Sequence, residues 1–190
     1  FYTQGGAAIL KAVPEVGCEL ISVKLDGNAL SVAADGTFTI PAGTTIGTLD
    51  VVFSANPLTI ANPNGSELKD LIAATGSNPN TLRTLKVTGK MTTKDWNYVM
   101  SSMPQLEMFD ISETTVTTIP EQALRDKDHL TTVHLPSTVT TIENSAFFSC
   151  DLLTTVDGCE KVKEIGSSAF GYCYKLANFP FGNEIRSIDD

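Results

Sequence analysis

The residues of this chain that could take part in covalent chemistry or metal binding are few and widely spaced. Nucleophilic catalysis needs a serine or cysteine beside a histidine base, and the two histidines, His129 and His134, lie at the ends of one segment, HLTTVH. The four cysteines contain no CxxC pair, and neither histidine lies at zinc-ligand spacing from them. They are Cys18, Cys150, Cys159 and Cys173. We therefore expect buried, reduced thiols and no metal site.

The segment VTGKMT at Val87–Thr92 resembles a phosphate-binding loop but lacks two of its required residues. Thr84 stands where the loop needs its first glycine, and Met91 stands where it needs serine or threonine. Carboxylate pairs such as Asp189 with Asp190 lie where solvated charge is the ordinary role. The sequence therefore predicts a protein that is not an enzyme and that needs no cofactor.

Charge and hydropathy exclude two further classes of partner. The chain of 190 residues carries a net charge of −9, which repels a nucleic-acid backbone and an anionic membrane surface. No apolar run approaches the roughly 18 residues that span a bilayer, and the first residues lack the pattern of a secretory signal. Because the sequence starts at Phe1 without methionine, we expect a processed or cloned piece of a longer protein.

The sequence contains a repeat of 23 residues, and this repeat must position the side chains that carry out the function of the protein. The phrase IENSAFFSC at Ile142–Cys150 returns as IGSSAFGYC at Ile165–Cys173, and the isoleucines keep the same interval at Ile119 and Ile188. A period between 20 and 29 residues with the form LxxLxL, here LTTVHL, is typical of leucine-rich repeats. A unit this small buries its apolar residues only by stacking on its neighbours.

Each repeat is expected to supply two short strands and one helical turn. Alternation places Leu130, Val133 and Leu135 inward, and a second extended piece, VTTI in one repeat and VKEI in the next, forms the opposite wall. The spacing of Ala146 and Phe147 from later apolar residues predicts a helical turn. Cys150 and Cys173 fall in the same slot of successive repeats, where a disulfide is geometrically conceivable, although parallel side chains favour reduced thiols.

The outward side chains of the first strands form the candidate binding face. Alternation sends Thr132 and His134 outward, with polar residues at matching positions in neighbouring repeats. The candidate residues are Lys86, Asp110, Thr132, His134, Thr155, Asp157 and Asn178. Such a mixed polar strip is the kind of surface that repeat proteins use to hold partners, and ordinary solubility is the competing interpretation. A cation between Asp110, His134 and Asp157 is a weaker hypothesis.

Two helices are expected before the repeats, and a different module before them. SELKDLIAA at 66–74 and TTKDWNYVMSSM at 92–103 have helical apolar spacing, with Thr92 and Asp95 as a capping box and Trp96 in the core. Residues 1–56 instead show Asp-Gly turn signals at 26–27 and 35–36 between short alternating runs, which predicts a small β-sandwich of four or five strands. The Pro- and Asn-rich segment that follows is the expected boundary, so residues 57–190 form the repeat domain.

The repeated pattern IxxxAFxxCxxL resembles the BspA-like, or Treponema pallidum type, leucine-rich repeats of bacterial surface proteins. The resemblance covers roughly residues 58–190, with departures at Leu124 and Lys127, where the pattern has phenylalanine and cysteine, and at Cys159, which stands where Pro136 stands one repeat earlier. It implies an α+β protein with a leucine-rich repeat solenoid, secretion or surface display, and binding of other proteins, including host matrix proteins. The first module is similar to the Ig-like domains that often precede such repeats.

Two functions from different classes follow. The first is a non-enzymatic surface protein that binds another protein through the outward strand face. The alternative is a carbohydrate-binding accessory module acting through residues 1–56, although the aromatic residues available there for sugar stacking are few. The repeats also stop at IRSIDD without a visible polar cap, so we expect a homodimer through that end or a longer natural chain.

Overall fold

The computed structural model describes residues 7–12, 18–33, 37–42, 48–55, 57–177, 182–183 and 185–189. Their regular elements are mostly strands, with two α-helices. The chain divides into two compact units, Phe1–Asn56 and Pro57–Asp190, and each is described here by itself. Asp35, Gly36, Asn178 and Asp190 lie outside the described residues.

The first unit contains two small antiparallel sheets that share one apolar core. Strand β1 (Ala8–Lys11) pairs with β4 (Thr37–Ile40), and β2 (Cys18–Leu25) lies between β3 (Asn28–Ala29) and β5 (Leu49–Ala55). Both sheets contribute buried side chains to the core: Val23, Leu25, Phe38 and Ile40. Asp26 and Gly27 form the predicted two-residue hairpin turn with φ values of 49° and 82°, which only a primed turn uses.

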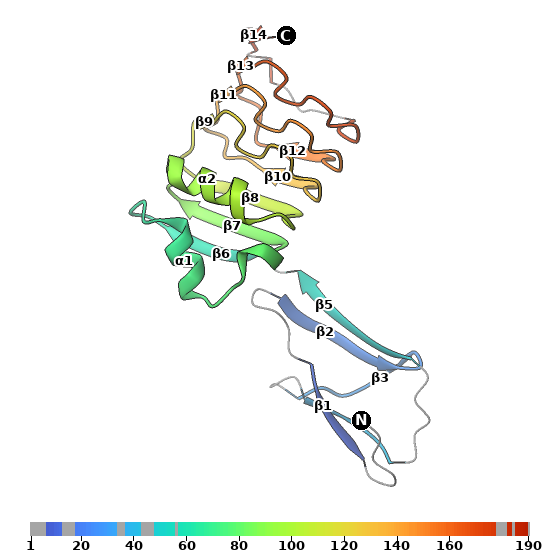
Figure 1. Ribbon diagram of the computed structural model, residues 1–190. Helices are drawn as coiled ribbons and strands as arrows, with labels where there is room; N and C mark the ends of the chain where they lie inside the picture. The colour runs from blue at the N-terminus through green and yellow to red at the C-terminus, as the bar shows by residue number, and fades with distance from the viewer. Residues whose placement is uncertain are drawn as a thin grey trace. The chain divides into compact units, whose positions relative to one another are not determined.

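The second unit contains two parallel sheets, which form the opposite walls of one core. The five-stranded sheet has the order β12-β10-β8-β7-β6, and the four-stranded sheet has the order β14-β13-β11-β9. Figure 1 shows these strands following one another in chain order from β6 to β14. The first sheet comprises β6 (Leu58–Asn62), β7 (Thr84–Gly89), β8 (Met108–Thr114), β10 (Thr132–His134) and β12 (Thr155–Asp157). The second comprises β9 (Thr118–Ile119), β11 (Thr141–Ile142), β13 (Glu164–Ile165) and β14 (Ser187–Ile188).

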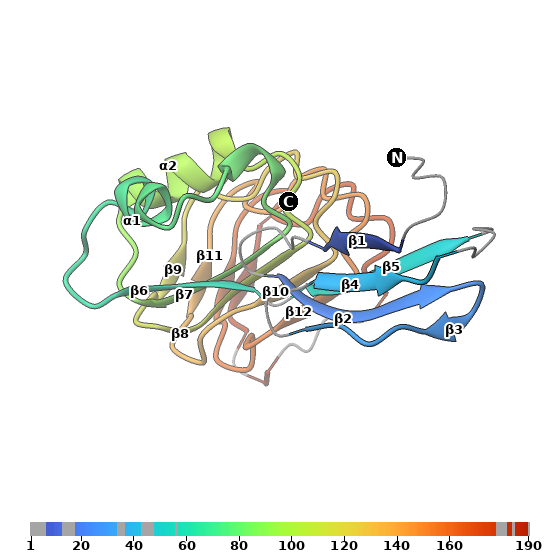
Figure 2. The same ribbon diagram turned by 90° about the horizontal axis from the view of Figure 1, so that it is seen from below.

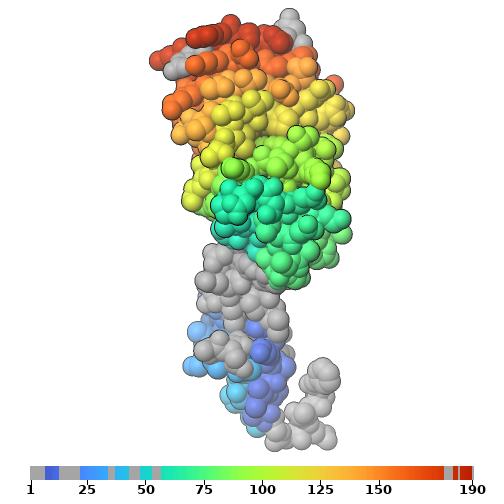
Figure 3. Space-filling model, turned by 90° about the vertical axis from the view of Figure 1, so that its left-hand side faces the viewer, coloured from blue at the N-terminus to red at the C-terminus, as the bar shows by residue number. Residues whose placement is uncertain are grey.

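The register of both ladders joins equivalent residues of the repeat. Val133 pairs with Val156, while Ile142 pairs with Ile119 on one side and Ile165 on the other. The inward residues Leu130, Val133 and Leu135 are buried, as their alternation predicted. In the space-filling view of Figure 3 the colours of this unit succeed one another as bands, so each repeat lies against the one before and the one after it.

Strand β6 corrects the interpretation of the segment after Asn56 as a plain boundary. Leu58–Asn62 pairs in parallel with β7 and alternates buried and exposed side chains, with Leu58 and Ile60 in the core. The proline and asparagine residues on both sides of this segment are typical of loops, so its short alternation was not recognised as a strand in the sequence. The strand belongs to the sheet that carries the candidate binding face.

Two helices cover the start of the repeat region and are tied together by one buried carboxylate. Helices α1 (Leu68–Ala74) and α2 (Thr93–Ser102) lie along the same side of β6, β7 and β8 (Figure 2); the short 3₁₀ helix η1 (Pro79–Thr81) leads into β7. Asp95, 1% exposed, completes the predicted capping box by accepting hydrogen bonds from the Thr92 backbone N–H and hydroxyl. Its other oxygen accepts from the backbone N–H of Leu68 at 2.7 Å. Trp96 is buried and meets Phe109 edge to face.

The segments between the two walls are successive turns, which corrects the expected helical turn. Ser145 and Ser149 have φ values of 53° and 60°, in the left-handed region that ends any α-helix. These left-handed residues interrupt the helical hydrogen-bond pattern. The N–H of Ala146 bonds within its own turn, whereas the N–H of Phe147 donates to the carbonyl of Ala169 in the next repeat at 2.8 Å. The turns therefore form a further column of hydrogen bonds between repeats.

Lys127 explains one departure from the repeated pattern. It occupies the position that Cys150 and Cys173 hold in later repeats, is 3% exposed, and lies beneath the C-terminal end of α2. Its ammonium donates hydrogen bonds of 2.8–3.0 Å to the carbonyl oxygens of Val99, Met100 and Met103. A helix ends with carbonyls that lack partners, so the repeat that contacts the helix needs three donors where later repeats need one.

Because the pKa of Lys127 is lowered in the folded chain, the free energy of unfolding depends on pH. Burial lowers this pKa from 10.5 to about 8 in the folded chain. Between these values the unfolded chain binds more protons, so the free energy of unfolding rises with pH. We expect the free energy of unfolding of the wild type, minus that of Lys127→Met, to increase between pH 8 and pH 10.5. Urea titrations across this range measure the difference, and a flat or falling difference would contradict the prediction.

Candidate functional site

Four outward side chains of the five-stranded sheet lie side by side and form what we call the strand-face row: Lys86, Asp110, His134 and Asp157. They come from β7, β8, β10 and β12. The ladder register pairs Lys86 with Asp110, Asp110 with His134, and His134 with Asp157. In a parallel ladder, residues in register on one face are direct neighbours. The fold thus brings together residues that are 23 or 24 positions apart in sequence.

The remaining candidate residues flank this row. Thr132 and Thr155 pair in register with each other on β10 and β12, and Thr132 pairs with Met108 on its other side. Thr132 is half-buried and Thr155 is exposed. Asn178 lies outside the described residues. Six of the seven predicted candidates therefore lie on one face of one sheet.

At the β7 end of the row, charges are neutralised within the protein. The Lys86 ammonium lies 2.5 Å from a Glu113 carboxylate oxygen and 3.4 Å from an Asp110 oxygen. The hydrogen bond to Glu113 raises the pKa of Lys86 despite its partial desolvation. Burial acts to raise the pKa of Asp110, but hydrogen bonds from the hydroxyl and backbone N–H of Ser112 and the charge of Lys86 outweigh it, so this pKa lies below its usual value. Lys86 and Asp110 are therefore both charged at neutral pH.

At the β12 end, the side chains are more exposed and less engaged. His134 Nδ1 lies 2.9 Å from Asp157 Oδ2, and the two side chains are 34% and 50% exposed. The other oxygen of Asp157, Oδ1, is buried and has no hydrogen-bond partner among the described residues. What this end of the row offers to a partner molecule is therefore the exposed part of the His134 and Asp157 side chains.

The hypothesis of a cation between Asp110, His134 and Asp157 gains no support from this geometry. Asp110 turns to Lys86 and Ser112, and only Asp157 contacts His134. Within the described part of the chain, no group of three histidine, cysteine or carboxylate side chains is placed to hold a metal ion. The strand-face row is thus a set of ion pairs and hydrogen bonds.

Sequence reasoning missed one member of this surface, Glu113. The pairing of β7 with β8 shifts register between Lys86 and Thr88, and this irregularity brings Glu113 to the ammonium of Lys86. No spacing rule in the sequence marks such a shift, because a bulge changes which side chains share a face.

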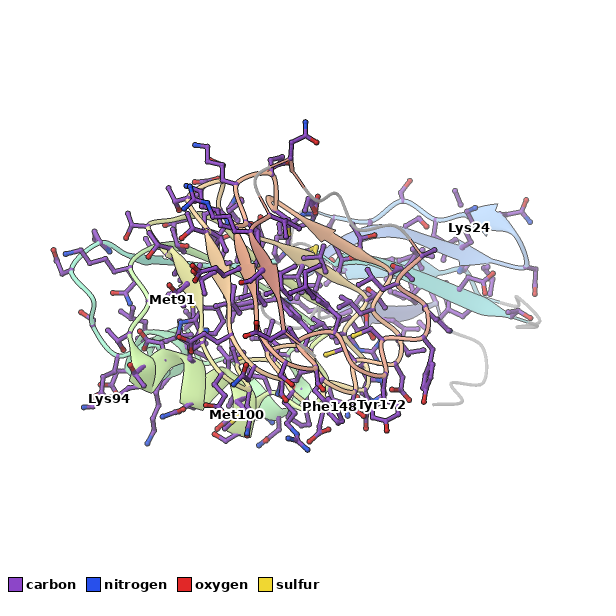
Figure 4. All side chains as sticks on the ribbon, turned by 90° about the horizontal axis from the view of Figure 1, so that it is seen from above. Lys24, Met91, Lys94, Met100, Phe148 and Tyr172 are labelled. Carbon is purple, nitrogen blue, oxygen red and sulfur yellow. The ribbon has the colours of Figure 1, made fainter. Side chains whose placement is uncertain are left out.

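A second surface feature that sequence reasoning missed is an aromatic cluster on the turns. The Arg125 guanidinium lies 4.8 Å from the ring centre of Phe148, and Phe148 meets Tyr172 edge to face at 5.0 Å. Tyr174 continues the cluster at 5.9 Å from Tyr172. Figure 4 shows Phe148 and Tyr172 at one edge of the unit. The signal was the second phenylalanine of the AFF phrase, which follows a core residue and so points away from the core.

A comparison with protein families identifies the repeats. The model of the BspA type leucine-rich repeat region matches residues 81–190 in six copies, which is more than half of the chain. No curated protein matches the sequence. Neither helix of the described part of the chain has the length and apolar content needed to cross a membrane. With the ladders and the in-register repeat, the match shows that this chain belongs to the BspA type leucine-rich repeat family.

Proposed function

We propose that this protein is a non-enzymatic binding protein whose strand-face row holds another protein. The repeats wind as a solenoid with turns of 23 residues, which presents equivalent positions of successive repeats on one continuous surface. Register pairs such as Ile119 with Ile142 and Ile142 with Ile165 support this winding. Leucine-rich repeats of this family are typical of surface or secreted bacterial proteins, so we also propose that the chain acts outside the cell.

The observation that carries the proposal is the alignment of four chargeable side chains on four neighbouring strands. Parallel strands lie about 4.8 Å apart, so the four side chains form a rigid strip across the sheet. Rigid presentation lowers the entropy that binding costs. The BspA type family of repeats supports a protein-interaction role for such a strip.

Charge favours a partner with basic groups. Lys86 contributes +1, and Asp110, Glu113 and Asp157 contribute −3, so the row and its neighbour carry −2 when His134 is neutral. The whole chain carries −9. Complementary charge speeds encounter and excludes acidic partners, so a basic patch on a matrix protein is the expected counterpart.

The test is binding to immobilised matrix proteins and glycans by the double variant His134→Ala, Asp157→Asn. These two side chains hydrogen-bond to each other and are both partly exposed, so the fold should persist. We expect the dissociation constant for a protein partner to rise at least tenfold, about 1.4 kcal/mol. The matched control is Thr141→Ala, Glu164→Ala, an exposed hydrogen-bonded pair on the opposite ladder.

Each outcome of the panel decides something. Protein binding lost by the double variant and kept by the control supports the strand-face row. Equal binding by all three chains contradicts it. Glycan binding that neither variant changes would favour the alternative, a carbohydrate-binding first unit; there Phe38 is buried, and Phe1, Tyr2 and the Phe53 side chain lie outside the described residues.

Self-association stays a prediction that the described residues do not test. Strand β14 is the edge of the four-stranded ladder, and its Ile188 is 63% exposed. An exposed strand edge offers unpaired backbone groups to another chain. Light scattering at several concentrations measures the mass, and a monomer at every concentration would remove the homodimer from the proposal.

A further inference from the structure

Two cysteines of successive repeats occupy one column of the structure. Cys150 and Cys173 each donate a thiol hydrogen bond of 3.1 Å to a carbonyl of the preceding repeat, Leu124 and Phe147 respectively. Beside this column the rings of Phe147 and Phe170 stack with centres 4.9 Å apart and an interplanar angle of 7°. The two repeats are therefore in close register at the level of the cysteines.

The two thiols are neighbours in this column. Both are free, and each shifts the pKa of the other. Neighbouring parallel strands are separated by about 4.8 Å, and disulfides join residues whose Cα atoms lie roughly 4.4–6.8 Å apart. The ring centres of Phe147 and Phe170, beside this column, are 4.9 Å apart, which lies within that range. Rotation of the two parallel cysteine side chains toward each other is therefore the motion that a bond between them requires.

The environments of the cysteines differ in a way that assigns them separate roles. Cys150 is fully buried, whereas Cys173 is partly exposed. The neighbouring Cys150 thiol lowers the pKa of Cys173 below its ordinary value, while the Cys173 thiol and burial raise the pKa of Cys150. Burial raises the pKa of Cys159 to about 12. A reachable thiolate next to a second thiol is the arrangement found at redox-active cysteines.

We propose that Cys173 and Cys150 form a reversible oxidation site, in which hydrogen peroxide or a similar hydroperoxide oxidises Cys173 and Cys150 then closes a disulfide between adjacent repeats. This inference does not depend on the proposed binding function. It concerns the ends of the turns that follow β11 and β13, segments that carry no residue of the strand-face row.

The chemistry balances with peroxide as the oxidant. The Cys173 thiolate attacks one oxygen of hydrogen peroxide, the O–O bond breaks, and the released hydroxide takes a proton to form water. The product is the sulfenic acid of Cys173. Cys150 loses its proton and attacks that sulfur, the S–O bond breaks, and the hydroxyl leaves with the proton as a second water. Two thiols and one peroxide thus become one disulfide and two waters, and a dithiol reductant restores the thiols.

The disulfide would change both the native contacts and the unfolded chain. It removes the two thiol hydrogen bonds to Leu124 and Phe147, and it constrains the unfolded chain between residues 150 and 173. We expect the constraint to outweigh the two lost bonds, since thiols are weak donors. Oxidised protein should therefore melt at a higher temperature than reduced protein.

The test uses the full chain carrying Cys159→Ser, reduced and then treated with graded hydrogen peroxide. After alkylation with iodoacetamide and digestion with trypsin, mass spectrometry should find peptides 128–161 and 164–175 joined, which in this background means Cys150 to Cys173. Dithiothreitol should separate them and reverse the rise in Tm. Met100, 39% exposed, serves as the internal control for the reach of the peroxide.

A second arm keeps the proposal testable if a variant folds poorly. In Cys150→Ser, the sulfenic acid of Cys173 should persist and be trapped by dimedone, provided circular dichroism shows the fold intact; the result with Cys159→Ser stands without this variant. If peroxide oxidises Met100 while Cys150 and Cys173 remain free thiols, which iodoacetamide then alkylates, the proposal is overturned. A linkage between two separate chains, or sulfinic acid at Cys173 with Cys150 still a thiol, would overturn it as well.

Discussion

Replacing Phe147 with alanine is expected to lower the free energy of unfolding by about 3–5 kcal/mol, the range measured for phenylalanine removed from packed cores. Phe147 is fully buried and lies among the largest side chains of the repeat core. Its ring stacks on that of Phe170 with an interplanar angle of 7°, so truncation leaves a void that the repeats on either side cannot fill without moving. Because each repeat is held mainly by its neighbours, the loss acts on both sides of the void.

The matched control for this prediction is the next residue in the chain. Phe148→Ala removes a ring of the same size from the outer edge, where Arg125 and Tyr172 contact it. Phe148 is only half-buried, so its removal should cost clearly less. Urea unfolding followed by circular dichroism measures both variants. Equal costs for the two variants, or an unchanged Tm for Phe147→Ala, would show that the stacked core is not what holds the repeats.

The second large effect is expected at Lys127. In Lys127→Met the apolar stem is kept, but the carbonyls of Val99, Met100 and Met103 lose their donor at the end of α2. Each of these three buried acceptors costs roughly 1–3 kcal/mol when it is left without a partner, and removal of the buried charge returns part of the sum. We expect a net loss of about 3 kcal/mol at neutral pH.

The choice of residue at this position provides the control. Lys127→Cys restores the residue of the later repeats, yet one weak thiol donor cannot serve three carbonyls. We therefore expect Lys127→Cys to be destabilised nearly as much as Lys127→Met at neutral pH, measured by the same urea titration. Wild-type stability in the cysteine variant would show that the slot needs only the residue of the repeat pattern, and that the end of α2 needs no donor.

The repeat and its core were predictable because burial recurs with the sequence. Leu130, Val133 and Ile142 each meet the same surroundings as their equivalents 23 residues away, so one local pattern, repeated, was enough to identify inward positions. The capping box at Thr92 was predictable for a similar reason, since its residues lie within one helical turn. The loss of this pattern before residue 57 is the reason for predicting a separate first domain.

The turns and the first strand were not predictable from the same pattern. Ala146 and Phe147 have the spacing of a helical face, but the N–H of Phe147 bonds to the next repeat, and left-handed residues at Ser145 and Ser149 allow this. Local spacing favours a helix, but a carbonyl of the neighbouring repeat accepts the hydrogen bond instead, so tertiary contacts override the local preference. Strand β6 was likewise visible only once β7 paired with it.

The repeated pattern was enough to predict which residues face inward and that Lys86, Asp110, His134 and Asp157 share the outward face, whereas Glu113 and strand β6 were not visible in it. The contacts among these side chains became visible only in the folded chain: Asp157 rather than Asp110 contacts His134, and Asp110 pairs with Lys86. The physical reason is the difference in range. Burial depends on an average environment that a periodic pattern encodes, whereas a hydrogen bond depends on positions within a few tenths of an ångström, and residues distant in sequence set those positions.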